Sequence, residues 1–392
     1  MASIRKRSWT DPNGDEQVRW LVDYRDQAGK RRSRQFTLKR DADAWKTETC
    51  FDVNRGTHTP LSRSITIAQA ATHWMARHHR ENLEATTIAA YEQHVRLHIL
   101  PACGGIKLSS LTSSMVEGFR DQFVEQLSRP MAIRVLRSLK AIVQEAKRRG
   151  HVAQNVCTDV KVGRATRKTK VIIPCKGEIR MIIRLASMSI DPMAMPLIVL
   201  LLFAALRASE LRGLCWRHVD LSRGTVTIDQ RADAKNVIGP PKSDAGFRTI
   251  PLPPLAIQVL RRWRTRCPKS ALNLVFPSLE GRVMTHRYMT QNVLKPVQIA
   301  AGIFEDIFNA DGTITPVLRY TLHDFRHAAA SLWIEQRVSA KRIQYWMGHS
   351  SIQVTFDLYG HLFEQADQDA AIASAVAHSL VGRFEQGWLE AA

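Results

Sequence analysis

The sequence of 392 residues lacks any apolar run long enough to cross a membrane. Its longest apolar run, Leu197 to Leu206, is far short of the roughly 20 residues that a membrane-spanning helix needs, so we interpret it as a buried helix. The first residues, Met1 to Arg7, are basic and lead into Trp9 and Asp11, which is not the pattern of a secretory signal. We therefore expect a cytoplasmic protein that has no membrane partner.

Cysteine is scarce, and its spacing shows no pairing pattern. The six cysteines form no CxxC motif, which argues against a zinc site and against a disulfide framework. The adjacent His78 and His79 have no third ligand in register, and we expect both of them at the surface. No bound metal is predicted.

Acidic residues are outnumbered by basic ones. The 56 Lys and Arg against 36 Asp and Glu give a formal net charge of +20, which attracts a polyanion from a distance. Since no apolar run is long enough to span a membrane, the predicted partner is nucleic acid. The length suggests two or three domains, each able to bury its own core.

Residues 1–60 predict a small α+β domain. Two stretches of alternating polarity, Val18 to Tyr24 and Arg34 to Leu38, flank a turn of the form DQAG and indicate a hairpin. A helix is expected to follow, with Asp41 as its cap. Three arginines on or beside the hairpin are interpreted as DNA contacts, although a solvated charged face is the alternative: Arg31, Arg32 and Arg34.

The remainder divides into a helical part and a larger mixed part. Helical periodicity over residues 64–155, with Ser64 or Thr66 as the first helix cap, predicts an all-helical domain. Residues 176–392 predict a mainly helical domain with strands at Thr225 to Ile228 and Phe247 to Leu252. Between them, 156–175 is a basic linker that could follow a phosphate backbone. Its predicted DNA-binding residues are Arg164, Arg167, Lys168 and Lys170. The predicted fold is thus mainly α with small β elements.

Several residues in the third part have the side chains that chemistry on phosphate requires. The segment FAALRASELRGL places Arg207 and Glu210 three apart in an otherwise apolar helix, where a structural ion pair is an equally good interpretation of these two residues alone. Downstream, LHDFRHAAAS carries His323 and Arg326 at the same spacing. The segment WMGHSSIQVTFDLYGH then adds two more such residues, His349 and Tyr359.

The segments LRASEL, HDFRHAAAS, MGHSS and YGH resemble the active-site segments of the tyrosine recombinases, the family of phage integrases. By this resemblance the active-site positions are Arg207, His323, Arg326, His349 and Tyr359. The family also has a catalytic lysine ahead of a strand of the form RTxPL. In PPKSDAGFRTIPL this position is Lys242, with Lys235 as the competitor.

Two departures from the family pattern are small. Ala204-Ala205 stands where the family often has Thr-Gly, and Met347 stands where Leu is usual. We expect neither to disturb the chemistry. The resemblance continues upstream, where LHILPACGGIKLSSL looks like the helical, SAM-like core-binding domain, and the N-terminal hairpin and helix look like the arm-site domain of larger integrases.

The resemblance implies a site-specific DNA recombinase. It would cleave and rejoin DNA through a 3'-phosphotyrosyl intermediate at Tyr359, without a cofactor, and would integrate or excise a mobile element. Two guanidiniums would stabilise the phosphate, Glu210 would orient Arg207 or a histidine, and Lys242 would protonate the leaving oxygen. His323 would bind the phosphate or carry the tyrosine proton.

The partners implied are DNA attachment sites, a homotetramer on synapsed DNA, and accessory bending and excision proteins. Apolar residues at helix-like intervals after Tyr359 are predicted to pack on a neighbouring protomer, the alternative being their own domain: Ala366, Ala370, Ile372, Ala373, Val376 and Leu380. Three other functions are weighed: a DNA-binding regulator without catalysis, a DNA-relaxing topoisomerase and a metal nuclease. The regulator leaves the cluster of motif residues unexplained, and a metal nuclease would need more carboxylates.

Overall fold

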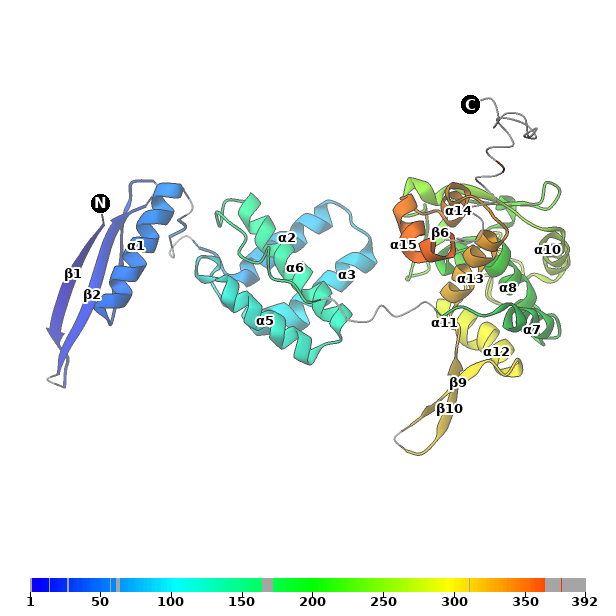
Figure 1. Cartoon of the computed structure of the whole chain (residues 1–392), viewed down its shortest axis with the longest axis horizontal. Coiled ribbons are helices and arrows are strands. Elements are labelled where there is room, and N and C mark those ends of the chain that lie inside the picture. The colour runs from blue at the N-terminus through cyan, green and yellow to red at the C-terminus, as the bar shows by residue number, and fades with distance from the viewer. Residues whose placement is uncertain are drawn as a thin grey trace, which may run out of the picture. The chain divides into compact units, whose positions relative to one another are not determined.

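The computed structural model of the chain describes residues 2–13, 15–26, 28–56, 58–60, 64–163, 172–309, 311–363 and 375. They form two compact units, Met1–Lys168 and Thr169–Ala392 (Figure 1). Within the described ranges, no helix is both long and apolar enough to cross a membrane. Four predicted linker contacts, Arg164, Arg167, Lys168 and Lys170, lie outside the described residues, as does the predicted tail contact set from Ala366 to Leu380.

The first unit begins with a three-stranded antiparallel sheet of order β1-β2-β3. Its strands are β1 (Ser3–Thr10), β2 (Glu16–Arg25) and β3 (Arg31–Phe36), and helix α1 (Lys39–Arg55) packs on one face. Trp45 of α1 meets the rings of Tyr24 and Phe36 at centroid distances of 5.4 and 5.5 Å. These aromatic contacts fix the helix against β2 and β3.

Sequence reasoning found the second hairpin and missed the first strand. The predicted turn is present: the carboxylate of Asp26 accepts hydrogen bonds from the backbone N–H groups of Ala28 and Lys30, and Gly29 has a φ of +73°. Strand β1 has the sequence SIRKRSWT. Its charged residues interrupt the alternation of polar and apolar residues that is typical of a strand. The helix starts at Lys39 and not after Asp41 as predicted, with Leu38 at its N-cap.

The second part of the first unit is helical. Its elements are α2 (Ile67–Arg80), α3 (Ala85–His94), a π-helical turn (Val95–Ile99), α4 (Leu100–Cys103), a short 3-10 turn (Leu108–Ser110), α5 (Ser113–Gln126) and α6 (Arg129–Arg148). Thr66 caps α2 in a reciprocal pair with Gln69. The apolar faces of these helices form one core, which includes Ile67, Leu139 and Ile142.

One surface prediction in this helical part is wrong. The side chain of His78 is only 12% exposed, because its ring packs against Trp74 and Tyr91 at centroid distances of 4.7 and 5.1 Å. His79 does lie at the surface. His78 faces the bundle because it lies one helical turn after Trp74.

The second unit is mainly helical around a small sheet. Its helices are α7 (Lys176–Ser187), α8 (Ala194–Phe203), α9 (Ala208–Gly213), α10 (Pro254–Arg266), α11 (His286–Tyr288), α12 (Lys295–Ala300), α13 (Leu322–Glu335), α14 (Ala340–Met347) and α15 (Ile352–Phe363). Its strands are β4 (Val219–Asp220), β5 (Thr225–Ile228), β6 (Arg231–Ala232), β7 (Ile238–Gly239), β8 (Arg248–Pro251), β9 (Phe304–Phe308) and β10 (Ile314–Leu318).

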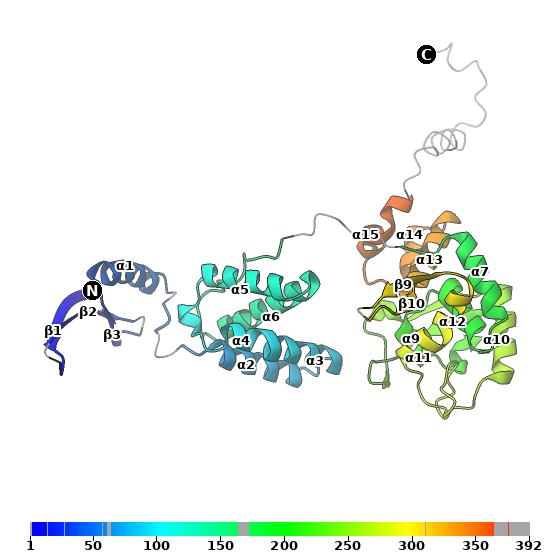
Figure 2. The ribbon, with the colours of Figure 1, turned by 90° about the horizontal axis from the view of Figure 1, so that it is seen from below.

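The centre of this unit is α8, whose apolar run is buried as predicted. The sheet has the order β4-β5-β8, so the two predicted strands, β5 and β8, pair directly in an antiparallel register. Helices α13, α14 and α15 contact one another (Figure 2). Of the predicted catalytic residues, His323 and Arg326 lie on α13 and Tyr359 lies on α15. Arg207 lies at the junction between α8 and α9.

Candidate active site

The junction between α8 and α9 corrects the expectation for Arg207. The predicted continuous helix is broken: α8 ends at Phe203, Ala205 has a φ of +50°, and Arg207 is the N-cap of α9. Glu210 therefore reaches back to the N-cap, where its carboxylate accepts hydrogen bonds from the backbone N–H of Arg207 at 2.8 Å and from its Nη1 at 2.7 Å. This reciprocal contact fixes the Arg207 side chain, which is 36% exposed.

Glu210 is also held by Arg248, which sequence reasoning did not single out. The Nη1 and Nη2 atoms of Arg248 donate to the carboxylate at 3.0 and 2.7 Å, and both side chains are buried. Burial would raise the pKa of Glu210, but the hydrogen bond and charge of Arg248, followed by the charges of Arg207 and Arg326, lower it to about 2. Glu210 is thus a carboxylate that neutralises buried arginine.

Three arginines meet at the C-terminal end of α14. Arg248 Nε donates to the carbonyl of Trp346 at 2.7 Å, Arg326 Nη2 to that of Met347, and Arg207 Nη2 to that of Gly348 at 2.7 Å. The last carbonyls of a helix have no partner within it and carry partial negative charge, so they favour cations. The end of α14 therefore gathers positive charge from three separate segments.

Arg326 lies deepest in this cluster. It is 1% exposed, and its second terminal nitrogen, Nη1, donates to the carbonyl of Ala205. Burial lowers the pKa of Arg326 to about 9, with help from the charge of Arg207, so the group still carries its charge at neutral pH. Ala205 presents that carbonyl from a left-handed conformation that glycine adopts more easily.

Gly348 allows the close approach of these segments. Its φ is +63°, and a Cβ there would lie 2.9 Å from the carbonyl oxygen of Ala245 and 3.0 Å from Nη1 of Arg248. The next residue, His349, is buried and its Nδ1 is 2.9 Å from Thr355 Oγ1. Burial, followed by the charge of Arg326, lowers the pKa of His349 to about 4, so its imidazole is neutral at pH 7.

Tyr359 is buried beside the arginine cluster. Its side chain packs among Ala205, Ala329, Ala330, Ile334, Ile343 and Met347. Its hydroxyl lies 2.5 Å from Nδ1 of His327, the histidine that follows Arg326 on α13. Burial raises the pKa of Tyr359, and the charge of Arg326 opposes that rise.

His327 and Arg248 are the site residues that sequence reasoning missed. The signals for them were present: His327 lies one helical turn after His323 in HDFRH, and Arg248 opens the strand RTIPL, where Arg248 and Ile250 share the buried face. His323 itself is exposed, and its ring meets that of His327 edge-on at 4.5 Å.

The two lysine candidates lie in different loops. Lys242 is exposed between β7 and a 3-10 turn (Asp244–Gly246), and that turn contacts the site because Gly246 accepts a hydrogen bond from Arg248. Lys235 lies in the turn between β6 and β7, where its backbone N–H donates to Asp233. The segment of Lys242 is therefore the one joined to the arginine cluster.

No group of three or more His, Cys, Asp or Glu able to hold a metal occurs among the residues that the structure describes.

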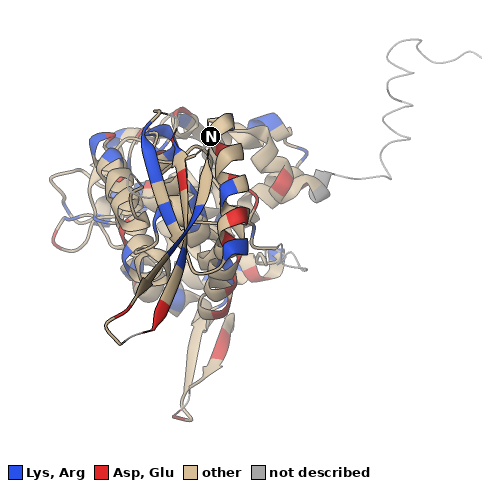
Figure 3. Ribbon diagram, turned by 90° about the vertical axis from the view of Figure 1, so that its left-hand side faces the viewer, with Lys and Arg blue, Asp and Glu red and all other residues tan. Residues whose placement is uncertain are grey.

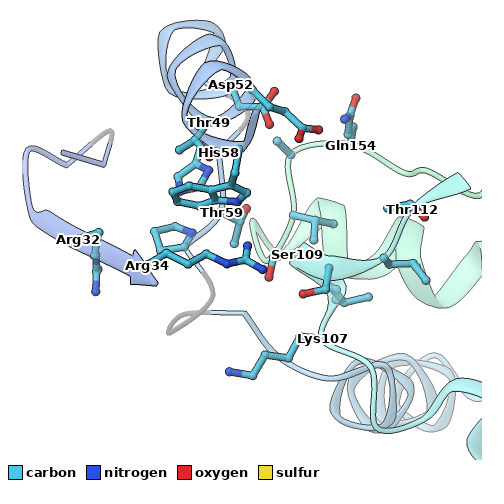
Figure 4. Close-up of a pocket in the computed structure, with 18 of the residues that line it drawn as sticks. Arg32, Arg34, Thr49, Asp52, His58, Thr59, Lys107, Ser109, Thr112 and Gln154 are labelled. Carbon is cyan, nitrogen blue, oxygen red and sulfur yellow. The ribbon is translucent and has the colours of Figure 1, made fainter. Parts of the chain in front are cut away.

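The predicted DNA contacts of the first unit lie on two different faces of the sheet. Side chains alternate along a strand, and Arg32 and Arg34 lie on the face that α1 covers. Both line a hollow with Thr49 and His58, and Figure 4 shows the Arg34 guanidinium reaching into it. Arg32 is paired with Asp26 at 2.9 Å, and the Arg34 guanidinium lies 5.2 Å from the ring centre of Trp45.

Arg31 faces the opposite way, onto the side of the sheet that lacks α1. By the strand register it shares that side with four more arginines of β1 and β2, and Figure 3 shows the basic colouring of these strands. These arginines are Arg5, Arg7, Arg19 and Arg25. We call this set of five the open-face arginines.

Comparison with known proteins identifies one family. The phage integrase family profile matches residues 177–366, and the profile of the phage integrase N-terminal SAM-like domain matches residues 66–123. A tyrosine recombinase XerC-like protein of Caldanaerobacter subterraneus subsp. tengcongensis is 24% identical over 381 residues, covering 91% of this chain and 95% of that protein. The ICEBs1 integrase of Bacillus subtilis is 26% identical over 272 residues, covering 67% and 70%.

Solved structures show the same fold. The Tn1549 transposon integrase, in complex with transposon right end DNA, has a TM-score of 0.65 and 22% identity over 80% of this chain and 100% of that chain. A lambda integrase dimer bound to a COC' core site has a TM-score of 0.56 and 15% identity over 92% and 95%. The predicted mainly α fold with small β elements is confirmed. Since profiles of both parts of one family match in order along the chain, the protein belongs to the phage integrase family of tyrosine recombinases.

Proposed function

We propose that this chain is a site-specific DNA recombinase that breaks and rejoins DNA through Tyr359 and integrates or excises a mobile element. The observation that carries the proposal is the meeting of Arg207, Arg326 and Tyr359 around the end of α14. A phosphodiester gains negative charge as it is attacked, and this arrangement places fixed positive charge beside a phenol. The names of the ICEBs1 and Tn1549 integrases, which refer to mobile elements, support the biological role.

The arginines stabilise the attacked phosphate. Arg207 is the most exposed arginine of the cluster and binds a nonbridging oxygen. The buried Arg326 adds positive charge and holds the segments of Ala205 and Met347 in place. Loss of one preorganised donor of this kind costs about 3 kcal/mol of transition-state stabilisation. Glu210 acts through Arg207 and is a positioning residue.

The chemical step exchanges one phosphate ester for another. The Tyr359 oxygen attacks phosphorus, the bond to the 5'-oxygen breaks, and the 3'-phosphate remains attached to the tyrosine. Lys242 gives a proton to the departing 5'-oxygen, and the phenol loses one. Attack by the 5'-hydroxyl of a partner strand reverses these steps, so the reaction needs no metal or nucleotide cofactor.

The proposed partners are duplex attachment sites and three further copies of the chain. A lambda integrase tetramer bound to a Holliday junction, with a TM-score of 0.56 to this chain, supports the assembly. Accessory DNA-bending and excision proteins belong to the same proposal. The open-face arginines and Arg34 supply contacts to flanking arm sites, whereas Arg32 stabilises the turn at Asp26.

The test is covalent trapping on a nicked duplex. The duplex carries the attachment site, located by footprinting in the DNA that flanks the gene, and the reaction contains EDTA. The chain should become linked to a 3'-phosphate through Tyr359, and Tyr359→Phe should bind the duplex equally well and form no adduct. Tyr345→Phe is the control, since Tyr345 is half exposed on α14 and its hydroxyl accepts a hydrogen bond from the Thr249 N–H.

Three results would contradict the proposal. An adduct that persists in Tyr359→Phe would assign the nucleophile elsewhere. Cleavage that EDTA abolishes would indicate a metal-dependent reaction. Relaxation of a plasmid that lacks the site would favour a topoisomerase over a recombinase.

A further inference from the structure

We infer that His327 is the catalytic residue that accepts the proton of Tyr359 as the phenol attacks DNA and returns it on rejoining. The inference rests on the proposed function, because it assigns a role in the same reaction. It adds a histidine that lies outside the five motif positions, which are Arg207, His323, Arg326, His349 and Tyr359.

The contact itself is direct. His327 Nδ1 lies 2.5 Å from the Tyr359 oxygen, with the ring planes inclined at 58°. The two residues come from different helices, α13 and α15, which pack against each other. A heavy-atom distance of this size is within the range required of a base and its substrate proton.

Burial leaves few other destinations for the proton. His327 and Tyr359 are 7% and 3% exposed, so bulk water does not reach the phenol in this conformation. His349 directs its Nδ1 to Thr355 instead. The exposed His323 stacks edge-on against the ring of His327 and is placed to pass a proton outward.

Burial, followed by the surrounding charges, keeps the His327 imidazole neutral. Burial lowers the pKa of His327 to about 4, with help from the charges of His323 and Arg326 and against that of Asp324. Tyr359 from α15 and the neutral His349 complete the titratable groups around it. A neutral imidazole with its proton on Nε2 has a free electron pair on Nδ1.

The energetics require transfer during attack, not before it. Burial raises the pKa of Tyr359, so the phenol keeps its proton at neutral pH. As the bond from the oxygen to phosphorus forms, the phenol becomes acidic and its proton moves to Nδ1. His327 becomes an imidazolium, Lys242 has protonated the 5'-oxygen, and the phosphate in the duplex nearby stabilises the added charge.

The test separates proton transfer from positioning. His327→Gln keeps a side-chain oxygen that can accept a hydrogen bond from Tyr359 but cannot take up its proton. On the nicked duplex defined above, His327→Gln should bind normally and form the adduct at least about a hundredfold more slowly, as for loss of a general base. Its rate should rise steeply with pH, because hydroxide must replace the imidazole.

A sulfur substitution identifies which proton is involved. A duplex with a 5'-bridging phosphorothiolate has a leaving group that needs no acid, so Lys242→Ala should recover on it while His327→Gln stays slow. His327→Ala, which opens space at Nδ1, should be accelerated by added imidazole, and the inactive Tyr359→Phe should not. Recovery of Lys242→Ala and of His327→Ala also shows that these two variants are folded.

Three results would overturn the inference. They are adduct formation by His327→Gln within about threefold of the unchanged chain, recovery of that variant on the phosphorothiolate, or failure of imidazole to accelerate His327→Ala. Each result counts only in experiments in which the unchanged chain forms its Tyr359 adduct. Failure of that adduct would instead count against the proposed function.

Discussion

At the scale of single residues, Glu210 organises the site. It is a buried carboxylate between Arg207 and Arg248, and those two arginines and Arg326 bind three consecutive carbonyls at the end of α14. A buried charge that loses its partner is costly, so the carboxylate matters to folding as well as to the placement of Arg207.

Glu210→Gln should therefore lower the free energy of unfolding by about 3 kcal/mol at pH 7, since Arg248 is fully buried and would lose its counter-charge. The measurement is urea unfolding of the whole chain. The control is Glu335→Gln, whose pair with Lys176 is half exposed on both sides and should contribute at most about 1 kcal/mol. Equal stability of Glu210→Gln and the unchanged chain would contradict this account.

The same substitution predicts a pH dependence. The pKa of Glu210 is lowered in the folded chain to about 2, so its stabilisation is fully present above the unfolded value near 4.3. That stabilisation is lost as the pH falls from there toward 2. The stability difference between the unchanged chain and Glu210→Gln should be constant from pH 7 to about 5 and shrink below it.

The motif residues could be proposed from the sequence because their spacing and flanks are local. The helix break at Ala205 could not, since FAALRAS contains good helix formers and the break is accompanied by a contact from Arg326 more than a hundred residues away. Arg248 and His327 acquire their roles in the same way. The sequence places each of them beside a motif or on a buried strand face, but the contact that defines its role is made with a distant partner, Glu210 or Tyr359.

At the scale of elements, the N-terminal sheet shows how alternation divides a basic cluster. Arg31, Arg32 and Arg34 are close in sequence, yet the strand places Arg31 on the side without α1 and the other two toward the helix. Their sequence predicted one DNA-binding group. The structure describes an open face with five arginines and a helix-covered face where Arg32 is held by Asp26.

Arg31→Gln should therefore weaken binding to arm-site duplexes and leave core-site binding unchanged. The slope of log affinity against log salt should become shallower by about 0.9 for each DNA phosphate that the variant no longer neutralises. Arg40→Gln on α1 is the matched control, because its side chain is 84% exposed and lies off the open face. Equal arm-site affinities and slopes for the two variants would remove the open face from the DNA interface.

At the scale of the whole molecule, charge is unevenly distributed along the sequence. The chain carries a net charge of +20, whereas residues 366–392 contain four acidic residues and one arginine. A segment that is acidic and also carries regularly spaced apolar residues suits a basic protein surface better than a phosphate backbone. This favours the predicted packing of the segment on another copy of the chain over a role in DNA contact.

Removing residues 366–392 should thus spare binding to a single half-site, because the remaining chain is more basic, with a net charge of +23 after removal of a segment with a charge of −3. Adduct formation at Tyr359 on a nicked half-site should also persist, since Arg207, Lys242, Arg326 and Tyr359 all precede the deletion. Pairing of two duplexes should weaken, because each protomer would no longer hold the next. Sedimentation of the protein with one and with two attachment sites measures the two steps separately.

Intact pairing and strand exchange would rule out the interaction between protomers, and failure of half-site binding or of adduct formation would place the segment on its own domain.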